Sequence, residues 1–212
     1  MSILKRFRIT NFSYSWSPLS YFTVVMIVVW FPLAKILPPQ IGWENGFLEN
    51  TQIIILFVGL LNCLYLTQGK LRKIWLSVAG IFLLMIGREL SWGRVFFPTG
   101  EVDACGPKFI SMIDVPGHTF IHAFIFYIIV AIAYILFHNT DFSAIKRIKL
   151  PLTSIVICTL SFLVQIVAEH HSIRGYSMPQ LQIVEELAEM VCYIEAVRCV
   201  NYYGNQLKRR DG

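Results

Sequence analysis

The sequence predicts an all-α integral membrane protein with six transmembrane helices, and three observations lead to that prediction. The chain is 56% hydrophobic and only 15% charged, whereas soluble domains carry about 25% charged residues. It contains six apolar stretches close to the length of about 20 residues that a helix needs to cross the hydrocarbon core. Short basic clusters lie between these stretches in an alternating order. With no internal repeat and no separate soluble region, residues 1–212 are expected to form one polytopic membrane domain.

The expected spans follow the apolar runs along the chain. They are placed at residues 19–37, 47–67, 73–94, 118–138, 152–169 and 181–203. The first run follows a basic N-terminus, as a signal peptide does, but it is long for such a peptide and lacks a small-x-small cleavage site. It is therefore expected to remain as the first helix. The sixth run is the most polar of the six.

The orientation of the spans is predicted by the basic residues of the loops. Three lysines or arginines lie in each of four segments, namely the N-terminus, the second-to-third loop, the fourth-to-fifth loop and the C-terminus, which together hold 12 of the 18. The alternate loops carry only Lys108 and Arg174. Because basic loops stay on the cytoplasmic side, both termini are expected in the cytoplasm of a multi-pass plasma (inner) membrane protein. The longest outer loop, 97–117, is expected to fold back over the helix ends.

Composition argues against two other classes of protein. The net charge of +5 is spread over four short clusters and forms no single basic patch, so a nucleic-acid partner is not expected. Four of the five cysteines lie inside apolar runs, and only Cys105 lies in a polar loop. A disulfide framework is therefore not expected either.

The ionisable residues of helices two to six gather at the ends predicted to face outside. Placing such a side chain in hydrocarbon costs about 2.5–3.5 kcal/mol at least, so these residues usually face a bundle interior or a wet cavity and are paired. On helix six, Glu185 and Glu189 are one turn apart, Tyr193 follows one turn further in, and Glu186 is adjacent. Such neighbouring carboxylates require a metal ion, an arginine or protonation. The sequence thus predicts an outward-facing pocket of arginine, glutamate and histidine.

A metal site within this pocket is predicted from histidine spacing. His118 and His122 are four residues apart and share one helix face, from which both could reach one ion. Zinc is the expected cofactor. Glu169, His170 or a glutamate of helix six would complete the site, and His170 is the one assigned to it. The alternative is that these histidines are interfacial or core residues that hold no metal.

A membrane-embedded enzyme is the preferred function, namely a metal-dependent hydrolase or transferase that acts on lipid or lipid-linked substrates in the bilayer. The residues assigned to catalysis are Glu49, Arg88, Glu89, Glu169, Glu186 and Glu189. The residues assigned to substrate binding are Arg88, Arg94, Gln52, Trp92 and Tyr193. The alternatives are an ion- or proton-coupled transporter, a structural assembly protein and a haem-binding electron carrier. Glu195 and Arg198, deeper in helix six, are expected to form a structural ion pair.

Overall fold

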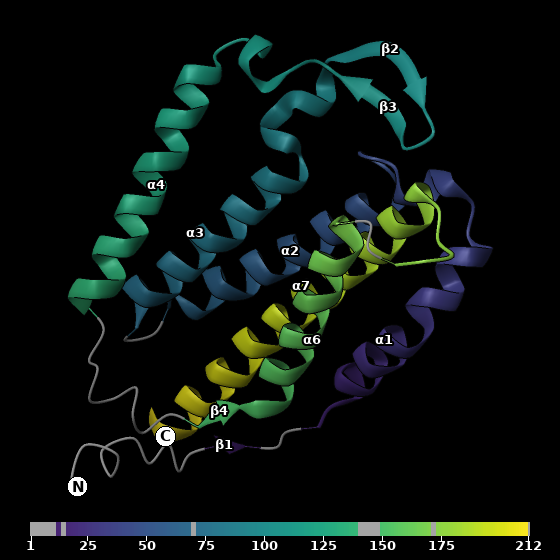
Figure 1. Ribbon diagram of the computed structural model, residues 1–212. Coiled ribbons are helices and arrows are strands. Elements are labelled where there is room, and N and C mark those ends of the chain that lie inside the picture. Colours follow the sequence, from purple (N-terminus) through teal and green to yellow (C-terminus); the bar gives the residue numbers. More distant parts are fainter. Residues whose placement is uncertain (1–11, 14–15, 69–70, 140–148, 171–172, 212) are drawn as a thin grey trace, which may run out of the picture.

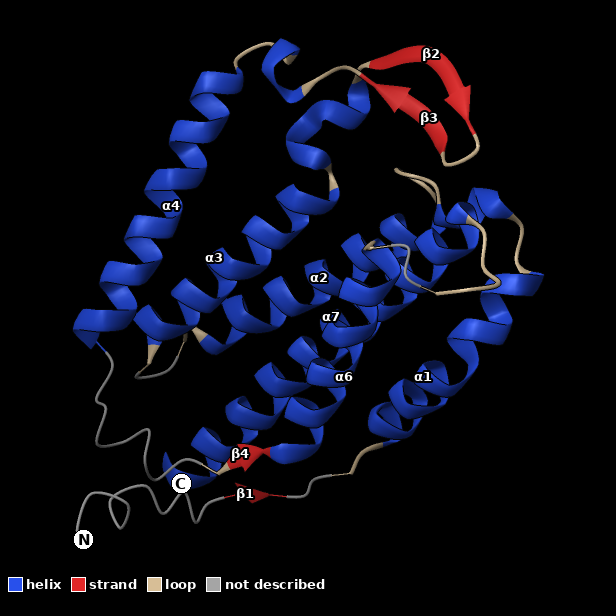
Figure 2. Cartoon of the chain, in the orientation of Figure 1, coloured by secondary structure: helices blue, strands red, loops and turns tan. Residues whose placement is uncertain are grey.

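The fold is described by a computed structural model that covers residues 12–13, 16–68, 71–139, 149–170 and 173–211. Within these ranges the chain is mostly helical (Figure 2). This confirms the predicted helical fold class, but not the number of membrane crossings. The long helices are α1 (Pro18–Ile36), α2 (Phe47–Leu66), α3 (Arg72–Glu89), α4 (His118–Asn139), α6 (Leu152–Glu169) and α7 (Met178–Asp211). Short strands and single 3-10 turns connect them.

Four helical stretches of the described chain are long and apolar enough to cross a membrane. They are Pro18–Ile36, Pro39–Leu66, His118–Asn139 and Leu152–Glu169. The second of these joins the 3-10 turn η2 (Pro39–Gly42) to α2. The composition is therefore that of a membrane protein. The helices α3 and α7 carry more charged side chains, and α7 is also longer than the expected 181–203 segment.

The most polar helix lies in the centre of the bundle. α7 packs against α1, α2 and α6, while α3 packs against α2 and α4 (Figure 1). Because neighbouring helices surround α7, its polar side chains can be buried against protein instead of hydrocarbon. Glu189, Glu195 and Arg198 are all buried in this way. By contrast, α4 has no fully buried residue and lies at the edge of the bundle.

Two apolar clusters hold the helices together. Trp30 of α1 and Leu187 of α7 belong to the first, and Leu56 of α2 and Phe82 of α3 belong to the second. Gly59 allows α2 and α3 to approach closely, because a Cβ atom there would lie 2.3 Å from the Phe82 ring. Burial of this apolar surface and close packing in both clusters fix α7 between α1 on one side and α2 with α3 on the other.

The third helix ends five residues earlier than the sequence predicts. α3 stops at Glu89, and a 3-10 segment, η3 (Ser91–Phe96), follows it. Ser91 and Trp92 have φ values of 42° and 53°, in the left-handed region that ends a helix. The Trp92 ring lies back against Gly87, where a Cβ atom would be 2.4 Å from it. Arg94 therefore belongs to the connecting segment and not to α3.

The segment between α3 and α4 forms a small β-hairpin that the sequence did not predict. β2 (Pro98–Asp103) pairs antiparallel with β3 (Gly106–Phe109). Gly106 packs on Trp43, so close that a Cβ atom would lie 2.8 Å from the indole ring. The hairpin thus covers the segment before α2. The turn η4 (Met112–Asp114) leads into α4, and at the opposite end of the molecule β1 (Phe12–Ser13) pairs parallel with β4 (Leu150–Pro151).

Candidate functional site

Three carboxylates from two helices meet near the end of α3. Glu89 is the last residue of α3, and Glu186 and Glu189 lie in the first third of α7. One oxygen of each lies within 4.8 Å of the other two. Glu89 is 7% exposed and Glu189 is 5% exposed, so water screens their mutual repulsion only weakly. We call Glu89, Glu186 and Glu189 the carboxylate cluster.

In the described part of the chain, one guanidinium group, that of Arg88, contacts this cluster. Arg88 donates to the Glu189 carboxylate and to the Tyr193 hydroxyl, the latter at 2.9 Å. Its Nη1 is 3.7 Å from Glu89 Oε1. The Tyr193 hydroxyl in turn donates to Glu89 Oε1 at 2.5 Å. One arginine cannot neutralise three adjacent carboxylates, so the cluster needs further cations or bound protons.

Two glutamine side chains complete the surroundings of the cluster. The Gln165 amide, from α6, donates to Glu189. The Gln52 amide, from α2, donates to the Glu186 carboxylate at 2.9 Å and to the Glu186 backbone carbonyl at 2.8 Å. Gln52 is completely buried, and its Oε1 has no hydrogen-bond partner within the described part of the chain. A buried carbonyl oxygen is stabilised by a donor or a cation, and this one belongs to the amide group whose nitrogen contacts Glu186.

The chemistry of these oxygens favours a hard cation. Carboxylate and amide carbonyl oxygens are the ligands that Mg²⁺, Mn²⁺ and Ca²⁺ prefer, whereas zinc sites are usually built from nitrogen and sulfur ligands. The cluster offers three carboxylates, and Gln52 offers an amide oxygen next to one of them. Among the described residues, the three carboxylates form the group that could hold a metal ion, and Gln52 could add a fourth oxygen.

Within the described residues, the structure places His118 and His122 side by side, but it does not bring all three predicted histidine ligands into one group. His118 and His122 lie at the start of α4 with their ring centroids 6.1 Å apart, and His122 is exposed. His170 follows the end of α6 and is exposed as well. In the described ranges, the group of three metal-ligand side chains that forms contains no histidine. His171 lies outside those ranges.

The other residues predicted for the site are not members of the carboxylate cluster and have their own contacts. Glu49, in the first turn of α2, accepts a hydrogen bond from the Asn45 N–H, one residue before the N-cap Gly46. It also lies near enough to Glu186 for the two carboxylates to repel one another. Glu169 is exposed at the end of α6. Arg94 pairs with Glu44, which also accepts from Ser91 Oγ at 2.8 Å.

A polar pocket lies beneath the β-hairpin, apart from the carboxylate cluster. Its volume is about 300 Å³. Its lining includes Glu44, Arg94, Asp103, Lys108 and Gln182. The Glu44–Arg94 pair at its wall is already formed. The structure therefore separates Arg94 from Arg88, which the sequence had placed in one substrate-binding group.

Gln165 was not among the residues assigned to catalysis or binding, although a signal for it exists. Ser161, Gln165 and Glu169 follow one another at four-residue intervals and so share one face of α6. The structure turns this face toward α7, where Gln165 reaches Glu189. Glu44 was also omitted, and no local pattern identifies it as the partner of Arg94, since 49 residues separate the two in the chain.

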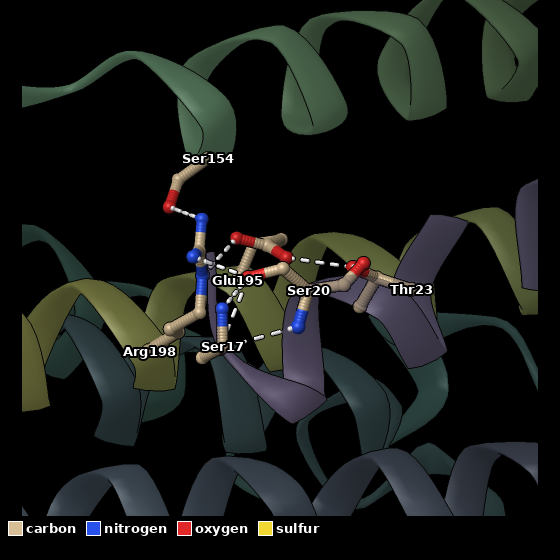
Figure 3. A network of polar contacts seen from close by, with 6 residues as sticks. All are labelled: Ser17, Ser20, Thr23, Ser154, Glu195 and Arg198. Carbon is tan, nitrogen blue, oxygen red and sulfur yellow. Dashed lines mark hydrogen bonds and ion pairs between the residues drawn. The ribbon is translucent and has the colours of Figure 1, made fainter. Parts of the chain in front are cut away.

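A separate ion-pair network lies deeper in the bundle. Glu195 accepts from Arg198 Nε at 2.7 Å and from Thr23 Oγ1 at 2.8 Å (Figure 3). Arg198 also donates to the hydroxyls of Ser20 and Ser154, so the network joins α7 to α1 and α6. Glu195 is completely buried and Arg198 nearly so. This full set of partners is what a structural ion pair requires.

Comparison of the chain with protein-family models, with curated proteins and with solved structures gave no match. The function must therefore be inferred from the carboxylate cluster and its surroundings.

Proposed function

We propose that this protein is a membrane-embedded enzyme that uses a divalent cation, held by the carboxylate cluster, to act on lipid or lipid-linked substrates. The observation that carries the proposal is the buried meeting of Glu89, Glu186 and Glu189 beside one arginine. A second observation supports it: Gln52 Oε1 is buried and has no hydrogen-bond partner in the described part of the chain. A divalent cation would neutralise the excess negative charge and satisfy that oxygen at once.

The proposed cation is Mg²⁺ or Mn²⁺ in place of zinc. The oxygen ligands support this choice, and the histidines lie at other positions in the fold. A cation at this position would polarise a carbonyl or phosphoryl oxygen of the substrate or activate a water molecule. Arg88, whose side chain is 56% exposed, would hold an anionic group of the substrate. The Tyr193 hydroxyl and Glu89 form the hydrogen-bonded pair through which a proton would move.

We further propose that the chain crosses the plasma (inner) membrane six times, with both termini in the cytoplasm. α3 and α7 would then cross as members of the bundle, their polar faces turned toward one another. The carboxylate cluster would lie toward the outer leaflet, because the loops at the other end of the bundle carry the basic residues. The hairpin of β2 and β3 would lie outside, above the site.

Binding of Mn²⁺ tests the proposed site directly. Wild-type protein in nanodiscs, titrated with Mn²⁺ and followed by electron paramagnetic resonance, should bind one ion in competition with Mg²⁺. Glu186→Gln keeps the size of the side chain but removes a charge. We expect it to weaken Mn²⁺ binding by about 10-fold or more, because altering even the groups that support metal ligands costs about 10–100-fold. Glu101→Gln is the control, since Glu101 is exposed on the hairpin and pairs with Lys108.

Activity is measured on the same preparations with phospholipid and polyprenyl phosphate substrates. We expect turnover that requires Mg²⁺ or Mn²⁺ and that is lost in Glu186→Gln but kept in Glu101→Gln. Equal Mn²⁺ affinity in wild type and Glu186→Gln would contradict the proposed site. Turnover that persists in wild type after chelation would contradict the role given to the cation.

A further inference from the structure

An apolar cavity of about 530 Å³ lies between α3, α4 and α7. Its lining side chains are almost all hydrocarbon, and they include Ile81, Phe82, Met85, Leu136, Ala196 and Tyr203. The volume is in the range of about 300–1,000 Å³ that small-molecule sites occupy. The cavity is therefore large enough to hold a ligand chain.

One end of the cavity lies about one helical turn from residues of the carboxylate site on both α3 and α7. Met85 lies four residues before Glu89 on α3, and Ala196 lies three residues after Tyr193 on α7. Residues three or four apart share one face of a helix, about 5 Å apart along its axis. On both α3 and α7, the face that lines the cavity is therefore followed, within about one helical turn, by residues of the carboxylate site.

The position of α4 determines what can enter this cavity. α4 packs against α3 but buries none of its residues completely, and Figure 1 shows it beside α3 at the edge of the bundle. A cavity between α3, α4 and α7 is accordingly bordered by the helix that is most exposed to the surrounding hydrocarbon. A lipid chain can replace bilayer contacts there without exposing polar groups.

The polar end of the cavity determines the headgroup that fits. Arg88 is half-exposed beside the cluster, and its guanidinium offers planar donors suited to phosphate oxygens. A zwitterionic headgroup would bring its own cation close to Arg88, whereas an anionic phosphate matches both Arg88 and a divalent ion at the cluster. Charge complementarity therefore favours an anionic lipid.

We infer that the substrate is a membrane lipid with an anionic phosphate headgroup, an inference that rests on the proposed function. Its hydrocarbon chain lies in the cavity between α3, α4 and α7. The headgroup lies at Arg88 and the carboxylate cluster, and the chain runs from there toward the basic end of the bundle. This is the direction in which a lipid of the outer leaflet extends in the orientation proposed above.

Photolabelling in nanodiscs tests this inference. The probe is phosphatidic acid with a diazirine at the end of one acyl chain, and phosphatidylcholine with the same labelled chain is the comparison lipid. We expect phosphatidic acid to label the cavity segments 71–85 and 196–203 several-fold more than the exposed face of α1, and more than phosphatidylcholine does. Ile81→Trp, which fills the cavity, should abolish the excess. Val28→Trp, a change of the same kind at an exposed position of α1, should keep it.

The same samples separate this inference from the proposed function. Ile81→Trp lies about two turns from the cluster, so it should bind Mn²⁺ as tightly as wild type does. Equal cavity labelling by the two lipids, or excess labelling that survives in Ile81→Trp, would overturn the inference while Mn²⁺ binding still supports the proposed site. Excess labelling without Mn²⁺ binding in wild type would leave the lipid site in place and contradict the proposed cation.

Discussion

Single charged residues deep in a bundle are stable only when their partners remain. Glu195 and Arg198 are such a case, because each is buried and each hydrogen-bonds to hydroxyl groups of neighbouring helices (Figure 3). Desolvation of two ions costs several kcal/mol, which their attraction and hydrogen bonds offset. The pair therefore fixes the position of α7 relative to α1 and α6 more than it adds net stability.

Removing one member of this pair should destabilise the protein more than removing both members does. Arg198→Met leaves the Glu195 carboxylate buried without its cation, and we expect a loss of about 3–5 kcal/mol in the free energy of unfolding. Glu195→Met together with Arg198→Met should recover a large part of that loss, because no unpaired charge remains. Reversible unfolding by SDS in mixed micelles measures both variants. A double variant as unstable as Arg198→Met would show that the hydroxyl contacts, and not the unpaired charge, dominate.

At the scale of residues, helical periodicity predicted which side chains share a face but not which ones meet. Glu189 and Tyr193 are four residues apart, and both do contact Arg88. The choice of Glu189 as the partner of Arg88 depends on how α3 and α7 pack, which no short pattern in the chain contains. The i, i+4 spacing of His118 and His122 was equally regular, yet α4 places both away from the carboxylate cluster.

Close packing of α2 against α3 depends on one glycine, and this gives a prediction at the scale of elements. Gly59→Ala would place a Cβ atom 2.3 Å from the ring of Phe82, which is buried. We expect α2 and α3 to separate, at a cost of about 1–3 kcal/mol in unfolding free energy. Gly80→Ala is the matched control, because its nearest neighbour is the flexible end of Ile132 at 2.9 Å. Thermal unfolding in detergent should show a lower midpoint for Gly59→Ala only, and equal midpoints would contradict this account.

The boundaries of elements were predictable where composition changes and not where the backbone turns. α2, α4 and α6 lie within one residue of the apolar runs, since each run ends at polar or breaking residues. The end of α3 was missed because Arg88 to Arg94 continues a plausible helix in sequence. The left-handed conformations of Ser91 and Trp92, residues that seldom adopt them, arise from packing of the indole on Gly87. The hairpin of 98–109 was missed for a related reason, because β2 is exposed throughout and carries no alternating pattern, and β3 has only four residues.

At the scale of the whole molecule, the arrangement explains why the least apolar helix can be central. α7 has polar groups along much of its length, and it is enclosed by α1, α2 and α6. The apolar helices α1, α2, α4 and α6, in contrast, expose large hydrophobic side chains on their outer faces. Such exposed apolar surface is expected where a bilayer is the solvent. Hydropathy alone predicts this division only in part, since it identifies the four apolar stretches and leaves α3 and α7 undecided.

The orientation of the bundle in the membrane is testable by labelling one residue at each end. Thr99 lies on the hairpin and Gln68 lies at the end of α2, and both are exposed. In a Cys105→Ser background, Thr99→Cys in intact cells should react with a membrane-impermeant maleimide, because the hairpin lies on the side opposite the basic loops. Gln68→Cys should react only after the cells are permeabilised. The reverse pattern would place the carboxylate cluster toward the cytoplasm. The proposed lipid would then come from the inner leaflet, because the cavity and Arg88 would invert together with the bundle.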